Sequence, residues 1–440
     1  MKLIRRTFGL FLIVFATLSL VFQPAKAQSD SPLVLVMKAD GPIMPAMEEY
    51  IKRGVETADR QNADLLIIQL NTPGGDLLTT IDIIGVIRAS DVPVVIYVSP
   101  KNAIAGSAGA LITMAGQASA MAPESAIGAS SPISSTGENL TSTAEAKAIE
   151  ISKAAIRPLV EPRGEEALAL AESMIDNAKA VTADEALQAN LIDFIATDTD
   201  DLLAKLDGFT VQMDSGPRTL HTSSPEQESL PMTFIEEFLL LLTDPNISFL
   251  LIAIGVQAVL IEISSPGGWV AGFIGVVCLT LAVYGLGVLP VNWFGIIFMI
   301  TAFVLFILDI KAPTHGALTT AGVASFVVGA LVLFNSPGTP DFLRVSVPLV
   351  VTSGIVIGLL FFTILMFALR AMRRPISSGA ETFVGKIGTA TSWKDAGGQV
   401  QVQSELWTAD KADGSERISK GDKVEVVEIK GLRLKVRKIK

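Results

Sequence analysis

Residues 94–109 read V-V-I-Y-V-S-P-K-N-A-I-A-G-S-A-G. The first five, Val94–Val98, are β-branched or aromatic and predict a buried strand. After a short loop, Ala105–Gly109 places Ser107 among small residues, and the apolar pattern from Ser107 to Ala115 predicts a helix. The stretch therefore predicts a strand, a tight turn and a helix that opens at a serine, as in α/β folds.

A second glycine turn lies earlier in the chain. Leu65–Leu70 predicts a strand, Asn71-Thr72-Pro73-Gly74-Gly75 ends it, and Leu77–Ala89 predicts a helix. Either turn alone is most often an ordinary loop. The combined order of strand, Pro-Gly-Gly, helix, strand, Gly-Ser-Ala-Gly and helix is more specific. It places the Pro-Gly-Gly turn at the carboxyl edge of a parallel sheet, where α/β proteins bind ligands.

The alternation of strands and helices extends over residues 28–207 and predicts one α/β domain with a buried parallel sheet. Further strands are expected at Leu33–Met37 and Ala118–Met121, and further helices at Pro45–Arg60 and Ala144–Val160.

The composition requires membrane segments. The 440 residues are 50% hydrophobic and only 18% charged, so the chain is too apolar to be wholly water-soluble. Residues 232–370 should form a helical bundle of about five spans, because five apolar runs can each cross about 30 Å of hydrocarbon. These runs are Asn246–Ile263, Gly268–Leu289, Asn292–Ile310, Gly316–Phe334 and Ser346–Leu369. The stretch Phe234–Leu242 contains Glu236 and Glu237 and predicts an interfacial helix rather than a sixth span.

Residues 1–27 predict a cleaved secretory signal peptide. Lys2, Arg5 and Arg6 precede the apolar run Phe8–Phe22, and Ala25-Lys26-Ala27 has the small-x-small pattern of a signal-peptidase site. An uncleaved anchor is the alternative. The arginine pair is similar to a twin-arginine signal, but the very apolar run favours the general secretory route.

Two soluble segments flank the bundle. Residues 208–231 are polar and rich in Ser, Thr and Pro, and we expect a linker. Residues 371–440 predict a small antiparallel all-β barrel of about OB-fold size. Apolar residues alternate with polar ones in Gln399–Gln403, Lys423–Val426 and Leu432–Arg437, and glycine turns separate these runs.

Charge predicts the topology. With an exported N-terminus, five spans return the C-terminus to the cytoplasm, and the last span is followed by Arg370, Arg373 and Arg374. Residues 28–230 hold 13 basic and 29 acidic residues, whereas residues 371–440 hold 14 basic and 9 acidic ones. We expect a bacterial-type inner-membrane protein with an acidic exported α/β domain and a basic cytoplasmic barrel.

The composition limits which side chains could act in catalysis or bind a metal. The chain has one cysteine and two histidines, which excludes an internal disulfide and a His/Cys-rich metal site, and no cofactor or metal is expected. His221 and His315 lie in the expected linker and at a span boundary, outside the α/β domain. A serine nucleophile in that domain would need another base. A lysine can serve if burial among apolar groups lowers its pKa, so a Ser-Lys dyad is the hypothesis to test.

Ser107 is the candidate nucleophile. It opens a helix whose free N–H groups favour developing negative charge. The N–H groups of Ala108 and Gly75 could together form an oxyanion hole. In the alternative interpretation, the small residues only pack a tight turn. The acids Glu262 and Asp309, at predicted span ends, are interpreted as solvated caps rather than parts of an ion pathway.

The chain resembles a known family at these motifs. Thr72–Gly75, Ala105–Gly109 and Met121–Ala129 resemble the serine-protease motifs of the ClpP/crotonase superfamily, SppA-like branch. The order of signal, protease domain, helix bundle and small barrel resembles the long form of the NfeD family of membrane-bound serine proteases. The resemblance extends to Pro313–Phe334 in the bundle and to Gly421–Val427 in the barrel.

The resemblance implies a ClpP/crotonase-like fold and a Ser-Lys dyad. The family's lysine opens the helix that leads to a stretch corresponding here to Arg157–Gly164, and the matching position is Lys147. Lys153 is the rival, although it falls where the family usually has an apolar residue. For either lysine, the alternative is a solvated lysine on a helix face.

Two functions follow as hypotheses. In the first, the protein is an integral membrane serine endopeptidase. The resemblance implies polypeptide substrates with apolar segments, a stomatin-like (SPFH) membrane protein as partner, and a homo-oligomer. In the second, it is a non-catalytic scaffold whose barrel docks a stomatin- or flotillin-type partner. Nucleic-acid binding is not expected, because the barrel shows no aromatic-basic stripe beyond Trp393 and Trp407.

Overall fold

The structure is a computed structural model that describes residues 31–132, 142–264, 268–312, 314, 316–336, 339–372, 383–395 and 397–439. The expected signal peptide, residues 1–27, lies outside the described residues. The chain forms two compact units. One comprises the residues up to Val304 together with Ala321–Val356, and the other comprises Leu305–Thr320 and the residues from Ile357 onward.

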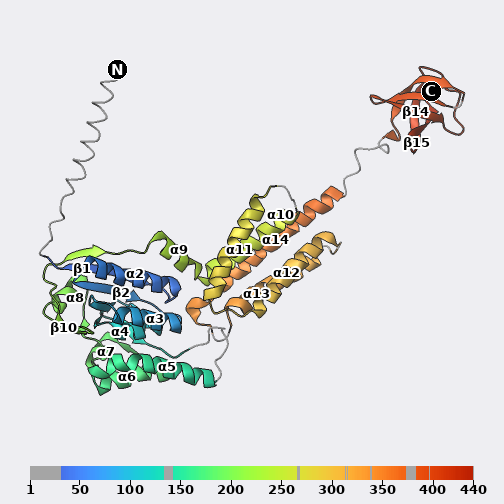
Figure 1. Cartoon of the computed structure of the whole chain (residues 1–440). Coiled ribbons are helices and arrows are strands. Elements are labelled where there is room, and N and C mark those ends of the chain that lie inside the picture. The colour runs from blue at the N-terminus through green and yellow to red at the C-terminus, as the bar shows by residue number, and fades with distance from the viewer. Residues whose placement is uncertain are drawn as a thin grey trace, which may run out of the picture. The chain divides into compact units, whose positions relative to one another are not determined.

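A six-stranded sheet forms the centre of the N-terminal domain, with strand order β11-β1-β2-β3-β5-β8 (Figure 1). All neighbouring strands pair in parallel. The strands are β1 (Leu33–Asp40), β2 (Leu65–Asn71), β3 (Val94–Val98), β5 (Ala118–Met121), β8 (Phe194–Ile195) and β11 (Glu226–Ser229). Every residue of β3 and β5 is buried, as expected for central strands that are covered on both faces.

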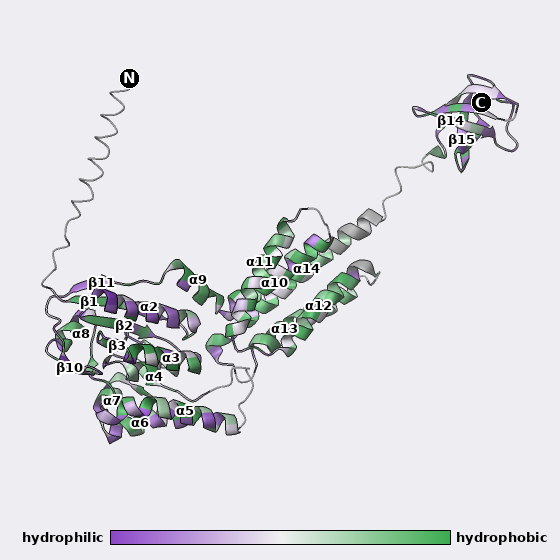
Figure 2. Ribbon diagram, in the orientation of Figure 1, coloured by the Kyte–Doolittle hydropathy of each residue, from purple (hydrophilic) through white to green (hydrophobic). Residues whose placement is uncertain are grey.

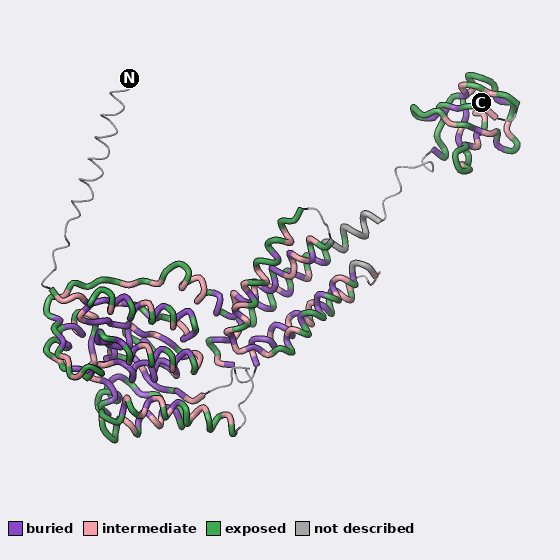
Figure 3. The backbone as a smooth tube through the Cα atoms, in the orientation of Figure 1, coloured by how far each residue is buried: buried purple, intermediate pink, exposed green. Residues whose placement is uncertain are grey.

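Both faces of the sheet are packed, because successive side chains of a strand point to opposite sides. Leu66 and Ile68 of β2 belong to the larger core, whereas Leu65 and Ile67 belong to a smaller core beside α8 (Thr199–Leu206). The tube in Figure 3 shows this burial along the sheet. The larger core is completed by α2 (Pro45–Gln61), α3 (Leu77–Arg88), α4 (Ala108–Ala115), α5 (Ser142–Val160), α6 (Glu165–Asp176) and α7 (Ala183–Gln188). The strands and helices named from the sequence all form, with ends shifted by about three residues or fewer.

A small second sheet stands beside the first. It contains β4 (Ile104–Gly106), β6 (Ala126–Gly128) and β7 (Ala180–Thr182) in the order β4-β6-β7. β4 pairs in parallel with β6, and β6 pairs antiparallel with β7. β4 leads directly into the serine turn and fixes where that turn starts.

Residues 208–231 fold onto the domain instead of forming the expected linker. β9 (Thr210–Met213) and β10 (Gly216–Thr219) form an antiparallel hairpin, and β11 becomes an edge strand of the main sheet. All four residues of β11 are polar and exposed, so they carry no hydrophobic signal. Backbone pairing with β1 and a hydrogen bond from Gln227 Nε2 to Asp200 Oδ1 at 2.9 Å hold this strand without apolar packing, which is why the linker interpretation was wrong.

The membrane region begins with α9 (Phe234–Leu242), whose bounds are those expected for the interfacial helix. Five apolar helices follow, and Figure 2 shows hydrophobic residues along them. They are α10 (Pro245–Ser264), α11 (Val270–Val288), α12 (Phe294–Lys311), α13 (Ala317–Phe334) and α14 (Val347–Met372). Within the described residues, four segments are long and apolar enough to cross a membrane: Pro245–Ile263, Val270–Val288, Ala317–Phe334 and Asp341–Thr363. The remaining expected span coincides with α12, whose described apolar stretch Phe294–Asp309 is shorter.

The two acids at helix ends are caps. The Glu262 carboxylate accepts hydrogen bonds from the backbone N–H groups of Trp269 and Gly272, both at 3.3 Å, at the start of α11. Asp309 accepts one from the Thr319 N–H at 3.0 Å, and also bonds the hydroxyls of Thr314 and Thr319 at the start of α13. Asp309 is buried rather than solvated, because the next helix folds back over it.

The C-terminal domain is a closed five-stranded barrel with strand order β12-β13-β14-β16-β15. Its strands are β12 (Ile387–Lys394), β13 (Gly397–Val402), β14 (Glu405–Lys411), β15 (Lys423–Lys430) and β16 (Arg433–Lys438). The inward residues include Val400, Val402 and Val424, as the alternation predicts. One pair, β14 with β16, is parallel rather than antiparallel, because an odd number of strands cannot alternate direction around a closed barrel.

Candidate active site

Ser107 lies between the end of β4 and the start of α4, in a strained backbone conformation. Its φ of 49° and ψ of −112° fall outside the regions that non-glycine residues favour. The Ser107 N–H donates to the Gly128 carbonyl at 2.7 Å, which ties the turn to β6. Strain of this kind persists only where the surroundings enforce it, and it is concentrated at functional sites.

The two glycine turns pack directly on each other. The Thr72 N–H donates to the Ile104 carbonyl at 2.7 Å, and the Gly106 N–H donates to the Thr72 carbonyl at 2.9 Å. A Cβ at Gly74 would lie 2.7 Å from the Ser107 Cβ, and one at Gly106 would lie 2.8 Å from the Pro73 carbonyl oxygen. Glycine is therefore required on both sides of the contact. The order of motifs in the sequence corresponds to one assembly in space.

The backbone N–H groups of Gly75 and Ala108 are available for a ligand. Among the described residues, neither has a backbone acceptor in the loops and turns around the site. Gly75 sits against Ile43, where a Cβ would come within 2.0 Å of the Ile43 carbonyl oxygen. Ala108 is the first residue of α4, where N–H groups have no intrahelical partner. The structure thus places both expected donors beside Ser107.

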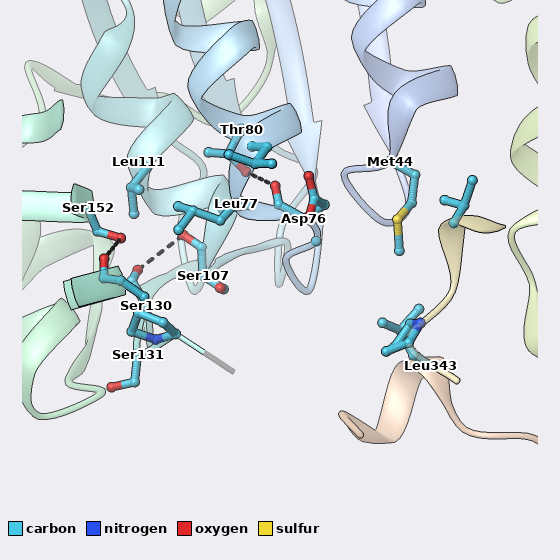
Figure 4. A pocket seen from close by; sticks show the side chains of 17 residues that line it. Met44, Asp76, Leu77, Thr80, Ser107, Leu111, Ser130, Ser131, Ser152 and Leu343 are labelled. Carbon is cyan, nitrogen blue, oxygen red and sulfur yellow. Dashed lines mark hydrogen bonds between the residues drawn. The ribbon is translucent and has the colours of Figure 1, made fainter. Parts of the chain in front are cut away.

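A cavity of about 300 Å³ opens at Ser107 (Figure 4). Its walls are mostly apolar, from Leu77 and Leu78 of α3, Leu111 of α4 and Pro132. Three further serines line it, namely Ser130, Ser131 and Ser152. Val288, Pro290 and Leu343 from the membrane region complete the lining. Ser107 therefore lies at a mostly apolar cavity.

Helix α5 brings its own residues to this cavity. Ala148 and the buried Ser152 line it, whereas the neighbouring Lys147 is exposed on the helix. The structure therefore brings the lysine-bearing helix to Ser107, but it shows no contact between Lys147 and Ser107 among the described residues.

The rival Lys153 forms an ion pair with acidic residues of α6. Lys153 Nζ lies 2.6 Å from Asp176 Oδ2 and 3.9 Å from Glu172 Oε2, both on α6. The hydrogen bond to Asp176 raises the pKa of Lys153 above its ordinary value. A base must shed its proton to act, so this ion pair makes Lys153 the weaker candidate.

One residue that supports the serine turn, and one ion pair that does not line the cavity, were not found from the sequence. The Ser130 hydroxyl donates to the Ser107 carbonyl at 3.1 Å and braces the strained turn. Arg163, just after α5, makes two hydrogen bonds of 3.0 Å to the Asp193 carboxylate, which also accepts from the Ser119 N–H of β5. Ser130 has no distinguishing sequence signal, because a serine in a small-residue loop is common.

Over the described residues, no cluster of His, Cys, Asp and Glu could hold a metal ion.

Comparison with known proteins identifies the family of the chain. Three family models match successive parts of the chain: the NfeD1b N-terminal domain at residues 33–213, the NfeD integral membrane domain at 246–367, and the NfeD-like C-terminal, partner-binding domain at 380–438. Over 411 residues the chain is 33% identical to membrane-bound protease PH1510 of Pyrococcus horikoshii, covering 91% of this chain and 92% of that protein. The chain belongs to the NfeD family.

Other NfeD proteins extend the comparison. The membrane protein NfeD1b of Bacillus subtilis is 26% identical over 456 residues, covering 98% of this chain and 97% of that protein. A solved structure of the 1510-N membrane-bound stomatin-specific protease, a lysine-to-alanine mutant with a substrate peptide, is 29% identical with a TM-score of 0.45, covering 48% of this chain and 98% of that one. The expected NfeD architecture is confirmed, with an α/β domain built on a parallel sheet, apolar helices and a five-stranded terminal barrel.

Proposed function

We propose that this NfeD protein is an integral membrane serine endopeptidase in which Ser107 is the nucleophile. The observation that carries the proposal is the Ser107 turn itself. It is strained, it opens a helix, and it packs against the Pro-Gly-Gly turn. Each turn contributes one free N–H group at the same cavity, Ala108 from the serine turn and Gly75 from the glycine turn. The similarity to membrane-bound protease PH1510 supports the same activity.

In the proposed reaction, Ser107 Oγ attacks the scissile carbonyl while Lys147 takes the hydroxyl proton. The Gly75 and Ala108 N–H groups stabilise the negative charge on the tetrahedral oxygen. Lys147 then returns the proton to the leaving amine, and water hydrolyses the acyl-enzyme. The cycle needs no metal or cofactor.

Lys147 must be shielded from water to act as a base. It is exposed in the single chain, whereas a neutral amine is favoured by removal from water. We propose that the bound polypeptide and a second copy of the chain bury it, so that dimers or larger oligomers complete the site.

The substrate proposed is an apolar segment of a membrane-associated protein. The cavity walls beside Ser107 are mostly hydrophobic, as such a segment requires. One similar protease is described as stomatin-specific, which supports a stomatin-type (SPFH) substrate or partner. The proposed placement is the inner membrane, with the α/β domain exported and the barrel in the cytoplasm, in accordance with the basic residues after the last span.

Active-site labelling tests this function. A serine-reactive phosphonate should label the full-length protein in detergent, and Ser107→Ala should abolish both the label and cleavage. Ser173→Ala is the matched control, because this serine lies on α6, away from the cavity lining, and its hydroxyl donates to the Leu170 carbonyl of its own helix at 2.7 Å. Full cleavage by the purified Ser107→Ala protein would refute the proposal.

A second function is proposed for the barrel, namely docking of a stomatin- or flotillin-type partner. The matching family model is a partner-binding domain, and the barrel exposes Leu406 and Leu432, with 58% and 83% of their surfaces accessible. Deleting the residues after Arg374 should abolish co-purification of the partner. The two functions are compatible, and retained labelling of Ser107 in the truncated chain would separate them.

A further inference from the structure

Helix α9 carries an exposed apolar face. Phe234 is 80% exposed, Ile235 67% and Leu241 50%, and the Phe234 and Phe238 rings stack at 6.1 Å. The helix is well capped, because the Thr233 hydroxyl accepts from the Glu236 N–H while the Glu236 carboxylate accepts from the Thr233 N–H. A stable helix that leaves aromatic and aliphatic side chains in water requires an apolar environment to cover them.

The other face of α9 is fastened to the α/β domain. Arg53 of α2 forms a two-point ion pair with Glu236, with Nε–Oε1 at 2.7 Å and Nη2–Oε2 at 2.9 Å, and Nη2 also donates to the Pro231 carbonyl at 2.8 Å. Burial alone would raise the pKa of Glu236, but hydrogen bonds from Arg53 and Thr233 hold it below its ordinary value. The Tyr50 hydroxyl donates to the Leu230 carbonyl at 2.6 Å and pins the approach to the helix. We call the contacts of Tyr50 and Arg53 with residues 230–236 the clamp.

The end of α9 is joined tightly to a membrane helix. α9 ends at Leu242, which is buried, and the candidate span Pro245–Ile263 starts three residues later. The Ser248 hydroxyl of α10 donates back to the Leu242 carbonyl at 2.9 Å, so the corner is fixed. The C-terminal end of α9 must therefore lie near the level of the lipid headgroups, because the span starts there.

We propose that α9 is a membrane-surface anchor whose face of Phe234, Ile235 and Leu241 inserts into the lipid interface, and that the clamp uses it to hold the catalytic domain at the membrane. The part of this inference that concerns catalysis rests on the proposed peptidase function. Lipid is the occupant that chain continuity favours over a protein partner. An apolar face in this position is expected to sit about 5–10 Å into the headgroup and acyl boundary.

Helix α2 connects the clamp to the cavity at Ser107. Arg53 lies in α2, and Met44, the residue that precedes α2, lines the cavity at Ser107. The same cavity is lined by Val288, the last residue of a candidate span. Anchoring α2 therefore keeps the cavity beside polypeptide that has just left the bilayer. This arrangement favours membrane-bound substrates over soluble ones by raising their local concentration.

Depth measurement tests the anchor without reference to catalysis. The full-length protein in phosphatidylcholine nanodiscs, with its single cysteine removed by Cys278→Ser, would carry a spin label at Phe234→Cys, at Leu241→Cys or, as control, at Glu56→Cys on the exposed side of α2. We expect oxygen to reach labels 234 and 241 better than a water-soluble nickel chelate, and the reverse at 56. Access by the chelate at 234 and 241 would overturn the proposal. Low access by both reagents would also overturn it, because a protein would then cover the face.

Activity tests the clamp. Replacing Phe234, Ile235 and Leu241 together by serine should lower kcat/KM about tenfold for a membrane-anchored polypeptide, through KM, and leave a soluble peptide of the same sequence unaffected. Arg53→Ala should likewise lower kcat/KM for the membrane-anchored polypeptide and leave the soluble peptide unaffected. Arg60→Ala, which removes only a contact with Thr57 on the same helix, should change kcat/KM for neither substrate. Equal losses on both substrates would refute the anchoring role. If the wild-type protein cleaves neither substrate, the peptidase proposal fails while the depth measurement still decides the anchor.

Discussion

The two halves of the candidate dyad are built in different ways. The nucleophile half consists of two loops in mutual backbone contact, where added Cβ atoms at Gly74 and Gly106 would collide with the opposite loop. The base half is one helix, α5, which brings Ala148 and Ser152 to the cavity but leaves Lys147 exposed. The conformation of Ser107 is thus fixed within the single chain, whereas Lys147 is exposed and, in the proposed mechanism, must be shielded from water before it can act as a base. The difference teaches that, if the dyad acts as proposed, the burial of α5 controls activity.

The largest expected effect contrasts the two lysines of α5. Lys147→Ala should lower kcat/KM for peptide cleavage by about 10³-fold or more, because it removes the proposed base. Lys153→Ala should change it little, since that amine is already paired with Asp176. Steady-state kinetics on purified full-length variants decides between them, and a severe loss only in Lys153→Ala would reverse the assignment.

The next effect tests the backbone half. Gly75→Ala should reduce kcat by about 10²–10³-fold, because the new Cβ would meet Ile43 and displace a proposed oxyanion donor. Gly85→Ala is the control. A Cβ at Gly85 in α3 has nothing within 4 Å, and alanine there should stabilise the helix by about 0.5–1 kcal/mol. Measuring kcat and melting temperature on both variants separates loss of the oxyanion donor from loss of folding stability. An unimpaired Gly75→Ala enzyme would rule out the oxyanion role.

A smaller effect is expected at the brace of the serine turn. Ser130→Ala removes the hydrogen bond to the Ser107 carbonyl, worth about 1 kcal/mol. If that bond holds the turn in its reactive conformation, kcat should fall about fivefold with KM unchanged. Ser173→Ala should leave kcat unaltered. A change confined to KM would show that Ser130 contacts the substrate instead.

The smallest effect is the pH dependence of the pairing between α5 and α6. The pKa of Lys153 is raised in the folded protein by its hydrogen bond to Asp176, from an ordinary value of 10.5. The stabilisation is therefore complete below that ordinary pKa and is lost as pH rises through the folded pKa. For a pair this exposed it amounts to about 0.5 kcal/mol. Thermal melts of wild type should decline above about pH 10 more steeply than those of Asp176→Asn, and identical curves would contradict the pairing.

Much of the fold followed from local pattern. The short β-branched runs placed β2 and β3, and the helical patterns placed α2 and α5, to within about three residues, because each pattern reflects which side chains are buried. The edge strand β11 did not follow, since four exposed polar residues give no such pattern. The same limit applies to Ser130, whose role depends on a carbonyl 23 residues away.

The sequence by itself determined the chemistry that this protein can use. The sequence placed both histidines outside the expected α/β domain, which left lysine as the candidate base, and glycine-rich turns after two strands marked the nucleophile. In the structure His221 follows β10 on that domain, but it is not among the residues that line the cavity at Ser107. Only the tertiary structure decided that the two turns touch, that Lys153 is held by Asp176 while Lys147 is exposed, and that Arg53 is bound to Glu236. The physical reason is separation along the chain. Residue types and short periods are local, whereas Arg53 and Glu236 are 183 residues apart and meet only when β11 and α9 fold back onto the domain.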